Sequence, residues 1–262
     1  MSSIRTLFSH RNLLFTLVKR DIALRYTGSA IGFVWTVINP IFLLIIYSVL
    51  FTSIIRVKLG EVPYNFVEFL FCGFWPWIAF QEAIIRSTNS IVENGNLIKS
   101  VIFPSEILTP SLVLSSFFQQ FIGFLLFIAV LAFMGRIPNL LALLLLPIPM
   151  FLQFILTMGL GWILSGINAF FRDTFQLINA AIIFWFFVTP IVYPEYLVPE
   201  HFRIFITINP ITHMVELYRS IILEGKLNIN WGTIYFSSIS IFFLILGDFV
   251  FKKLKVKFAD VI

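Results

Sequence analysis

Six apolar stretches divide this 262-residue chain, and each is long enough to cross a lipid bilayer. A membrane-spanning helix needs about 20 mainly apolar residues. Backbone groups inside lipid must be hydrogen-bonded within their own segment, so continuous runs of this length predict helices. A membrane barrel would show shorter, alternating segments. We therefore predict an all-α polytopic membrane protein with six transmembrane helices, over 33–55, 66–85, 107–133, 140–167, 175–193 and 231–251.

The composition supports a lipid environment for these segments. Hydrophobic residues make up 59% of the chain and charged residues only 12%. Soluble domains carry about 25% charged residues, and a soluble fold of this size could not bury so much apolar surface. Cys72 is the single cysteine and the three histidines are scattered, which excludes a disulfide framework and predicts no metal site.

Six spans place both chain ends on the same side of the membrane. Of the 18 Lys and Arg residues, twelve would lie on that side and six on the other. Cytoplasmic loops are enriched in Lys and Arg, so we predict cytoplasmic termini. The whole chain (1–262) is expected to form one transmembrane domain. It begins with a cytoplasmic interfacial segment (1–32), continues with a six-span core (33–251) and ends with a cytoplasmic tail (252–262). The core includes a cytoplasmic loop (86–106) and an extracytoplasmic hairpin (194–230).

The N-terminal segment has the pattern of a helix that lies on the membrane surface. It combines apolar residues at helical spacing with basic residues: Leu13, Leu14, Leu17, Val18 and Ile22 with Lys19, Arg20 and Arg25. This pattern predicts an amphipathic interfacial helix. Just before the first span, Gly28 and Gly32 fall on one helix face and predict close helix packing.

The segment between the fifth and sixth spans is too long for a simple turn and is partly apolar. Two short apolar pieces, each too short to cross the bilayer, meet at Asn209-Pro210. This arrangement predicts a helical hairpin over 194–230 that is either re-entrant or lies on the extracytoplasmic surface.

Motifs for nucleotide binding or catalysis are missing from the sequence. The only Gly-Lys pair, Gly225-Lys226, lacks the other residues of a P-loop. Glu82 and Asp248, near span ends, each have a basic residue four positions later, which predicts ion pairs within a helix and disfavours a proton relay. We therefore expect a transport protein and no enzyme, with energy supplied by a separate subunit.

Six short stretches, in order along the chain, carry a family resemblance. They are "RYTGSAIGFVWTVINP" (25–40), "NLIKSVIFPSEIL" (96–108), "FFRDTFQLI" (170–178), "FVTPIVYP" (187–194), "NPITHMVELYR" (209–219) and "KFADVI" (257–262). With them the chain resembles the membrane subunits of ABC-2 type exporters, specifically those for polysaccharides such as O-antigen, capsule and teichoic acid. The similarity covers nearly the whole length.

The resemblance implies a function and a set of partners. The expected assembly is a permease homodimer with two ABC ATPase subunits in the bacterial inner (plasma) membrane, in contact with membrane lipids. The expected substrate is a glycan linked to polyprenyl diphosphate. This chain would bind no cofactor, because ATP and Mg would be bound by the partner subunit. No nucleic acid partner is expected.

The loop between the second and third spans matches the position of the family's coupling helix, which docks into the ATPase. We expect this role for Asn94, Asn96, Leu97, Ile98 and Lys99. An ordinary solvated turn is the alternative, but exposed Leu97 and Ile98 beside a turn favour a docking surface.

A diphosphate headgroup needs cations at the cytoplasmic leaflet. Lys19, Arg20 and Arg25 lie at a suitable depth, and Arg25 is the leading candidate because arginine binds phosphate with two parallel hydrogen bonds. Contact with anionic lipids explains these charges equally well. Arg172 is a further gate candidate, for which a structural or gating role is favoured over substrate contact, and Asp173 is expected to cap the following helix.

A sugar chain suits a path of aromatic and polar side chains. On the first span, Trp35, Asn39 and Phe42 share a stripe at helical spacing, and Tyr47 and Phe51 lie on a neighbouring one. On the fifth span, Phe186 and Tyr193 line up, with Trp185 adjacent. With 33 Phe in the chain, aromatic residues fall on every helix face, so ordinary packing is a strong alternative. Trp and Tyr near span ends can also be interfacial anchors.

Several functions remain open at this point. The leading one is export of an O-antigen-like polysaccharide, followed by export of teichoic acid or capsule. An ABC-2 permease for drugs or lipids is a further alternative. A membrane-bound glycan polymerase is disfavoured, because the large extramembrane loops with catalytic residues that it would need are missing.

Overall fold

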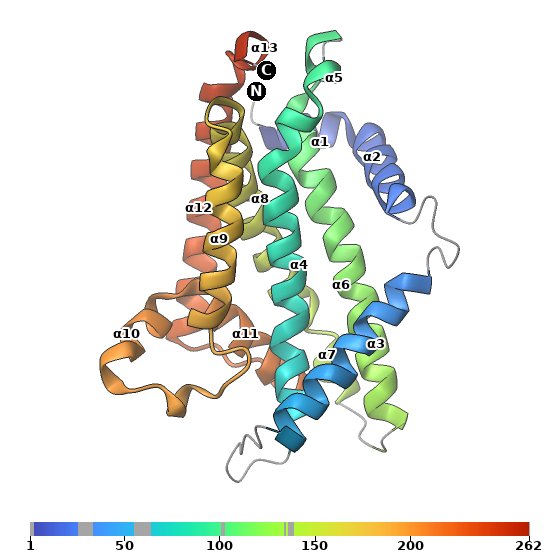
Figure 1. Ribbon diagram of the computed structural model, residues 1–262, viewed down its shortest axis with the longest axis vertical. Coiled ribbons are helices and arrows are strands. Elements are labelled where there is room, and N and C mark those ends of the chain that lie inside the picture. Colours follow the sequence, from blue (N-terminus) through green and yellow to red (C-terminus); the bar gives the residue numbers. More distant parts are fainter. Residues whose placement is uncertain are drawn as a thin grey trace.

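The computed structural model describes residues 3–25, 34–54, 64–100, 103–133, 135 and 139–261, and all regular structure in these ranges is helical. The predicted Gly28–Gly32 packing lies outside the described residues. Figure 1 shows the arrangement. The helices are α1 (Ser3–Ser9), α2 (Arg11–Leu24), α3 (Trp35–Ser48) with the π-helical η2 (Val49–Ile54), α4 (Phe66–Glu93), α5 (Gly95–Ser100), η3 (Ser105–Ile107), α6 (Leu108–Phe133), α7 (Leu140–Leu143), α8 (Pro147–Phe170), α9 (Asp173–Val188), η4 (Glu195–Leu197), α10 (Glu200–Ile208), α11 (Pro210–Ile222), α12 (Trp231–Lys255) and α13 (Phe258–Val261).

Each predicted span coincides with a helix. Three segments are long and apolar enough to cross a membrane, namely Ser105–Phe133, Leu141–Phe170 and Trp231–Lys255, and α9 is a shorter apolar helix. The length and composition of these helices fit a helical, multi-pass membrane protein. The interfacial segment also forms helices, α1 and α2, and α2 lies against α6.

The fourth predicted span matches the apolar segment Leu141–Phe170 but contains a turn, whereas the end predicted for the fifth span was wrong; a proline lies close by in both cases. The fourth span is not continuous: the short α7 ends at Leu143, and a new helix begins with Pro147 at its first position. The fifth helix ends at Val188, before the predicted Tyr193, because Thr189 precedes Pro190 and adopts an extended conformation with φ −89° and ψ 132°.

Helix α4 is central to the bundle. It packs against α6, α8, α9 and α11, and Phe71, Trp77 and Phe80 on it are fully buried. Its first turn has a capping box, in which the Asn65 side chain accepts from the Glu68 backbone N–H at 3.0 Å and the Glu68 carboxylate accepts from the Asn65 N–H at 3.2 Å.

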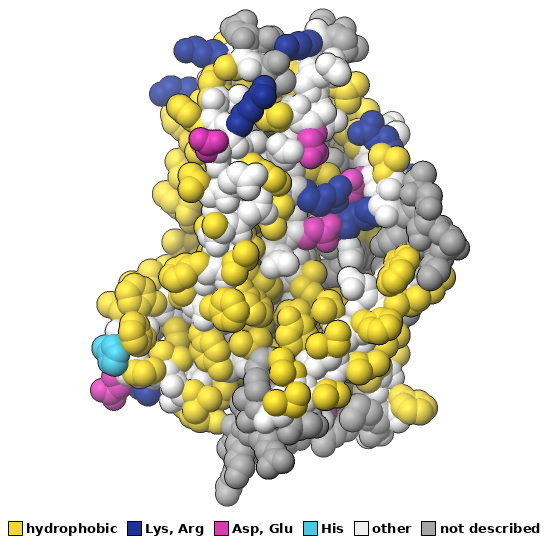
Figure 2. All heavy atoms as spheres, viewed as in Figure 1, with side chains coloured by type: hydrophobic (Ala, Val, Ile, Leu, Met, Phe, Trp, Pro, Cys, Tyr) yellow, Lys and Arg dark blue, Asp and Glu magenta, His cyan; other side chains and the backbone are white. Residues whose placement is uncertain are grey.

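The two ends of the bundle differ in what they carry. Both termini, α5 and α13 lie at one end, and α7, α10 and α11 at the other (Figure 1). Most of the Lys and Arg side chains on the face in Figure 2 gather toward the end with the termini, while hydrophobic side chains cover much of the rest. This arrangement agrees with an even number of crossings; the cytoplasmic orientation of the termini stays a prediction.

The predicted hairpin break at Asn209-Pro210 is confirmed. Helix α10 ends there and α11 begins, with Pro210 at its first position and the Asn209 side chain accepting from the Ile211 N–H at 3.0 Å. The two helices differ in burial: α10 is mostly exposed, whereas α11 packs into the core against α4 and α12.

Candidate functional site

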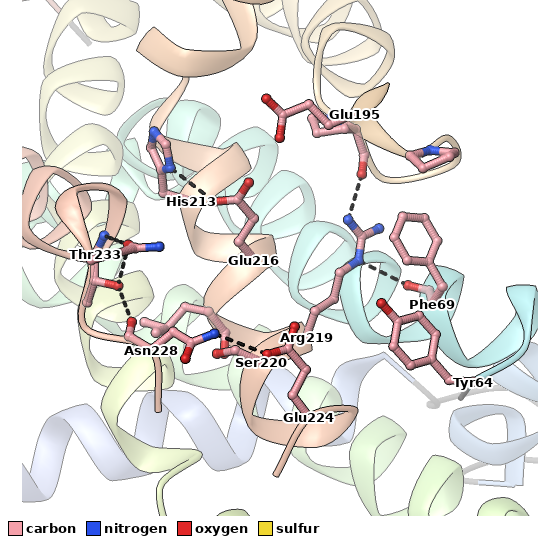
Figure 3. A pocket seen from close by; sticks show the side chains of 14 residues that line it. Tyr64, Phe69, Glu195, His213, Glu216, Arg219, Ser220, Glu224, Asn228 and Thr233 are labelled. Carbon is pink, nitrogen blue, oxygen red and sulfur yellow. Dashed lines mark hydrogen bonds and ion pairs between the residues drawn. The ribbon is translucent and has the colours of Figure 1, made fainter. Parts of the chain in front are cut away.

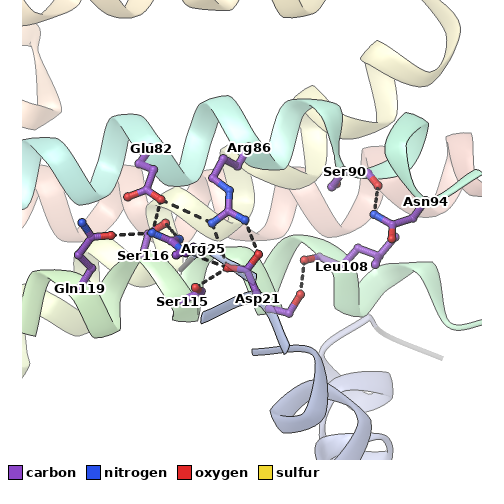
Figure 4. A network of polar contacts seen from close by, with 11 residues as sticks. Asp21, Arg25, Glu82, Arg86, Ser90, Asn94, Leu108, Ser115, Ser116 and Gln119 are labelled. Atoms are coloured by element: carbon purple, nitrogen blue, oxygen red, sulfur yellow. Dashed lines mark hydrogen bonds and ion pairs between the residues drawn. The ribbon is translucent and has the colours of Figure 1, made fainter. Parts of the chain in front are cut away.

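Four charged side chains, two from α4 and two from the C-terminal end of α2, meet in one cluster (Figure 4). Arg25 donates to Glu82 at 2.5 Å and lies 3.3 Å from Asp21. Arg86 pairs with both Asp21 carboxylate oxygens, one of them at 3.0 Å, and lies 3.5 Å from Glu82. Each arginine therefore contacts both carboxylates.

Helix α6 contributes polar groups to the same cluster. The Ser115 hydroxyl donates to Asp21 at 2.5 Å, and Arg25 donates to Gln119 at 2.6 Å and to Ser116 at 3.4 Å. Asp21, Arg25, Glu82, Arg86, Ser115, Ser116 and Gln119 are called the α2–α4–α6 cluster below. It holds the surface helix α2 to the bundle by charge-assisted hydrogen bonds, which are stronger than neutral ones.

The charges in this cluster are paired and partly shielded from solvent. The exposed fraction of the four side chains ranges from 15% for Asp21 to 30% for Arg86. Burial raises the pKa of Asp21, but the hydrogen bonds from Arg86 and Ser115 and the charges of Arg86 and Arg25 outweigh it, so the net shift of this pKa is downward. Asp21 is therefore a carboxylate at neutral pH.

The sequence predicted part of this cluster. The Glu82–Arg86 pair is confirmed, as is the Asp248–Lys252 pair. Asp21 was missed, although it precedes Arg25 by four residues, the same spacing as Glu82 and Arg86. That repeated spacing was the available signal, but it could not show that the two pairs share one site.

A hollow of about 370 Å³ lies beside the cluster. Its lining includes Arg20, Arg25 and Arg86 together with Glu93 and Asn94. The structure thus brings two predicted gate residues, Arg20 and Arg25, next to a predicted coupling residue, Asn94. Lys19 is exposed on the same helix as Arg20.

Arg172 lies elsewhere, exposed at the start of α9. The predicted capping role of Asp173 was wrong: Arg172 occupies the N-cap position, Asp173 is the first helical residue, and the described structure shows no side-chain cap there. The Asn168 side chain instead accepts a hydrogen bond from the Phe175 N–H at 3.1 Å.

The predicted coupling residues form a short helix and its boundary. Asn94 ends α4 and donates to the Ser90 carbonyl at 2.8 Å, and Asn96, Leu97 and Lys99 on α5 are exposed. Ile98 was expected to be exposed but is partly buried, because it packs against an apolar cluster that includes Phe258 of α13. The exposed side of α5 therefore presents Leu97 without Ile98.

The two predicted aromatic stripes differ in their surroundings. On α3, Trp35 and Phe42 are 43% and 59% exposed, and Asn39 between them is also exposed. Tyr47 instead packs edge-on against Phe74 of α4, with ring centroids 4.8 Å apart. The side chain of Phe51 lies outside the described structure.

The stripe on α9 is largely engaged in packing. Phe186 lies between Phe74 and Trp77, with centroid distances of 6.3 and 5.6 Å. The Trp185 indole N–H donates to the Asn209 side chain at 2.9 Å, and Tyr193 donates to a backbone carbonyl at 2.7 Å. Exposed aromatics of the predicted path are therefore found mainly on α3.

Comparisons with known proteins place this architecture in a family. The family model of the ABC-2 type transporter matches residues 12–223. The chain belongs to the ABC-2 type transporter family. As an ABC-2 permease it is the membrane subunit of an ABC transporter, and ATP hydrolysis belongs to a separate subunit.

Individual relatives match this ABC-2 permease over nearly its whole length. It is 32% identical to the O-antigen export system permease protein RfbA of Klebsiella pneumoniae, over 96% of this chain and 95% of the relative. It is 28% identical to the protein of the same name from Myxococcus xanthus, over 98% of each. The polysialic acid transport protein KpsM of Escherichia coli is 22% identical, over 88% of this chain and 89% of the relative.

Proposed function

We propose that the chain is the permease subunit of an ABC exporter that moves an O-antigen-like polysaccharide from the cytoplasm across the bacterial inner membrane. The observation that carries the proposal is the full-length similarity to O-antigen export permeases, which reaches 32% identity. The arrangement of the bundle supports it. Three arginines, together with the carboxylates of Asp21 and Glu93, line a hollow on the side of the termini, and exposed aromatic side chains follow α3 toward the other end.

The cytoplasmic gate is proposed at the hollow beside the α2–α4–α6 cluster. A polyprenyl-diphosphate headgroup would meet Lys19 and Arg20 first, because both are exposed on α2. Arg25 is already bonded to Asp21 and Glu82, so a diphosphate would have to compete with these carboxylates for its guanidinium. Such competition would loosen α2 from α4, which gives headgroup binding a way to open the gate.

The ATPase is proposed to dock at the end of the bundle that holds α5. Leu97 and Lys99 are exposed there, and α13 lies against α5. In this proposal two permease chains bind two ATPase subunits, and both termini are cytoplasmic. The positive charges gathered at that end support the orientation.

The glycan path is proposed along the exposed side of α3. Trp35, Asn39 and Phe42 present aromatic faces and an amide, which suit the apolar faces and polar edges of sugar rings. A second permease chain would close the path from the other side.

Gene deletion tests the proposal. Deletion should abolish the surface glycan and leave the lipid-linked glycan on the cytoplasmic side of the inner membrane, and plasmid-borne wild type should restore export. Deletion of the partner ATPase gene is the matched control and should give the same accumulation. Normal surface glycan in the deletion strain would contradict the proposed function.

Export of another polysaccharide, of the polysialic acid type, is the second candidate, because the polysialic acid transport protein matches 88% of this chain. Its identity of 22% is lower than the 32% of the O-antigen permease. Composition analysis of the glycan that accumulates in the deletion strain separates the two.

A further inference from the structure

A second hollow lies at the end of the bundle opposite the termini, about 330 Å³ in volume (Figure 3). It is formed by residues before and in the first turn of α4, the turn after α9, helix α11 and the first turn of α12. We call it the distal pocket. Its lining combines polar and apolar surface in similar measure, and its charged or titratable residues are Glu195, His213, Glu216, Arg219 and Glu224, with Tyr64. None of these residues belongs to the predicted gate or path.

Arg219 forms a preformed wall of the distal pocket. Its guanidinium donates to the backbone carbonyls of Phe69, Pro190 and Ile191 at 3.2, 2.9 and 2.9 Å. Its central carbon also lies 3.5 Å from the centroid of the Phe69 ring. These three bonds fix the position of the guanidinium, so Arg219 presents a positive charge at a defined place in the wall of the pocket.

Carboxylates supply acceptors on the other walls. The side chains of Glu216 and Glu224 are 40% and 39% exposed. Glu216 bonds His213 at 3.2 Å, and Glu224 accepts from Asn228 at 3.1 Å. A carboxylate has about four acceptor sites, so both groups can accept further hydrogen bonds from a ligand.

The chemistry of the lining selects the class of ligand. Three carboxylates face Arg219 and His213, and the carboxylate of Glu224 is also paired with Lys226 at 3.3 Å. The positive charges are thus matched by carboxylates, which leaves no surplus to bind an anion such as a diphosphate. No group of three metal-binding side chains occurs within the described residues, and the charged side chains in the walls do not suit an acyl chain. A sugar unit fits, because its hydroxyl groups both donate and accept, while its C–H faces can pack on Tyr64 and Pro194.

We propose that the distal pocket binds uncharged sugar units of the exported glycan after they have crossed the membrane. The inference rests on the proposed function, and on the predicted orientation that puts this end of the bundle outside the cytoplasm. Binding there would favour outward movement, because a glycan held at the exit is hindered from sliding back.

Binding of glycan fragments to the purified permease–ATPase complex tests the inference. The probe is host surface glycan, released from its lipid and cut to fragments of a few sugar units, with affinity measured by calorimetry. Glu224→Ala should weaken binding about tenfold, the effect of losing one hydrogen bond to a charged group. Glu200→Ala, at an exposed site on α10 outside the pocket lining, is the matched control and should bind as wild type.

Three results would overturn the inference: no saturable binding to wild type, equal affinity of the Glu224→Ala and Glu200→Ala complexes, or displacement of the fragments by inorganic pyrophosphate, which would identify an anion site. The proposed function is judged separately, by whether wild type restores surface glycan in the deletion strain. Restored export with unchanged binding by Glu224→Ala would reject the pocket and leave the exporter function standing.

Discussion

At the residue scale, Asp21 links three helices through one carboxylate. It accepts from Arg86 on α4 and from Ser115 on α6, and it pairs with Arg25 at the end of its own helix. Removing a partner from such a cluster costs more than the pair itself contributes, because the remaining charges lose their compensation. Asp21 therefore helps to hold α2 to the bundle, together with Leu17, which is buried in an apolar cluster with residues of other helices.

Asp21→Asn keeps the side-chain shape but removes the negative charge between Arg25 and Arg86. We expect the variant to lose about 1–3 kcal/mol of stability, since hydrogen bonds to a charged group are lost in a partly shielded site. Thermal unfolding in detergent measures this. Asp173→Asn, at the exposed start of α9, is the control and should lose less than about 1 kcal/mol, the contribution of one negative charge at a helix N-terminus. Equal thermal unfolding midpoints of the two variants would contradict the role of the α2–α4–α6 cluster in holding α2 to the bundle.

His213 makes the distal end of the bundle sensitive to pH. Its ring nitrogens face the Glu216 carboxylate at 3.2 Å and the Thr207 carbonyl at 2.8 Å, and its ring packs edge-on against Tyr235. Both nitrogens thus face acceptors, an arrangement that only the protonated ring satisfies. Burial lowers the pKa of His213, but these two bonds and the charges of Glu216 and Glu195 outweigh it, and the net shift of this pKa is upward.

The raised pKa of His213 determines in which direction the stability of the protein changes with pH. The stabilisation by His213 is fully present below its unfolded pKa, about 6.5, and is lost as pH rises through the higher folded pKa. We expect the thermal unfolding midpoint of wild type to fall as the pH rises above about 6.5 and through the folded pKa of His213. His213→Gln should be less stable than wild type at low pH and should show a flatter profile. Parallel profiles for the two proteins would refute this assignment.

At the element scale, α4 depends on its first turn. Asn65 and Glu68 cap each other's backbone N–H groups, and the residues that follow are almost all buried. Such reciprocal capping satisfies donors that would otherwise lack partners at a helix start.

Asn65→Ala removes the cap and should cost about 1 kcal/mol of stability. Asn65→Asp preserves an acceptor at the cap position and adds a favourable charge at the helix N-terminus, so it should stay close to wild type. Chemical unfolding of the two variants in detergent is the measurement. If Asn65→Ala and Asn65→Asp lose the same amount of stability, helix capping is not the role of the side chain at position 65.

The short C-terminal helix α13 is held against the bundle by one buried aromatic side chain. Phe258 is 1% exposed, and its ring lies 5.4 Å from Phe251 and 6.2 Å from Phe170. Because α13 also lies against α5, one buried aromatic residue ties the C-terminal tail to the proposed coupling helix.

At the scale of the whole molecule, the exposed aromatics of α3 and the packed aromatics of α9 should behave differently when changed. Trp35→Ala should reduce glycan export while leaving stability near wild type, because the side chain is 43% exposed. Phe186→Ala should lower stability by about 1–3 kcal/mol, less than a fully buried Phe, because its ring is partly buried between Phe74 and Trp77. Export assays paired with unfolding in detergent separate the two effects. If the Trp35→Ala variant is expressed and exports glycan at normal levels, the proposed glycan path along α3 is wrong.

Most of the helices and their order could be predicted from the sequence, because the features that mark them lie close together along the chain. The apolar run lengths located the helices, and Asn209-Pro210 marked the hairpin break. The structure departs from the predicted spans at two places, the break after Leu143 and the helix end at Val188. Both lie close to a proline, so these departures also depend on local backbone geometry. The family resemblance also followed from motifs that can be read along the chain, and the match to the ABC-2 type transporter confirmed it.

The sequence by itself thus determined a helical, multi-pass membrane protein of the ABC-2 type, because helix length, apolar content and motif order depend on neighbours along the chain. Only the tertiary structure decided which distant side chains meet. Spacing along a helix could not show that Asp21 reaches Arg86, or that buried Gln120, Gln153 and Tyr218 join three helices by hydrogen bonds of 2.6–3.1 Å. Those contacts depend on how the helices pack, and packing is set by the shape of many side chains at once.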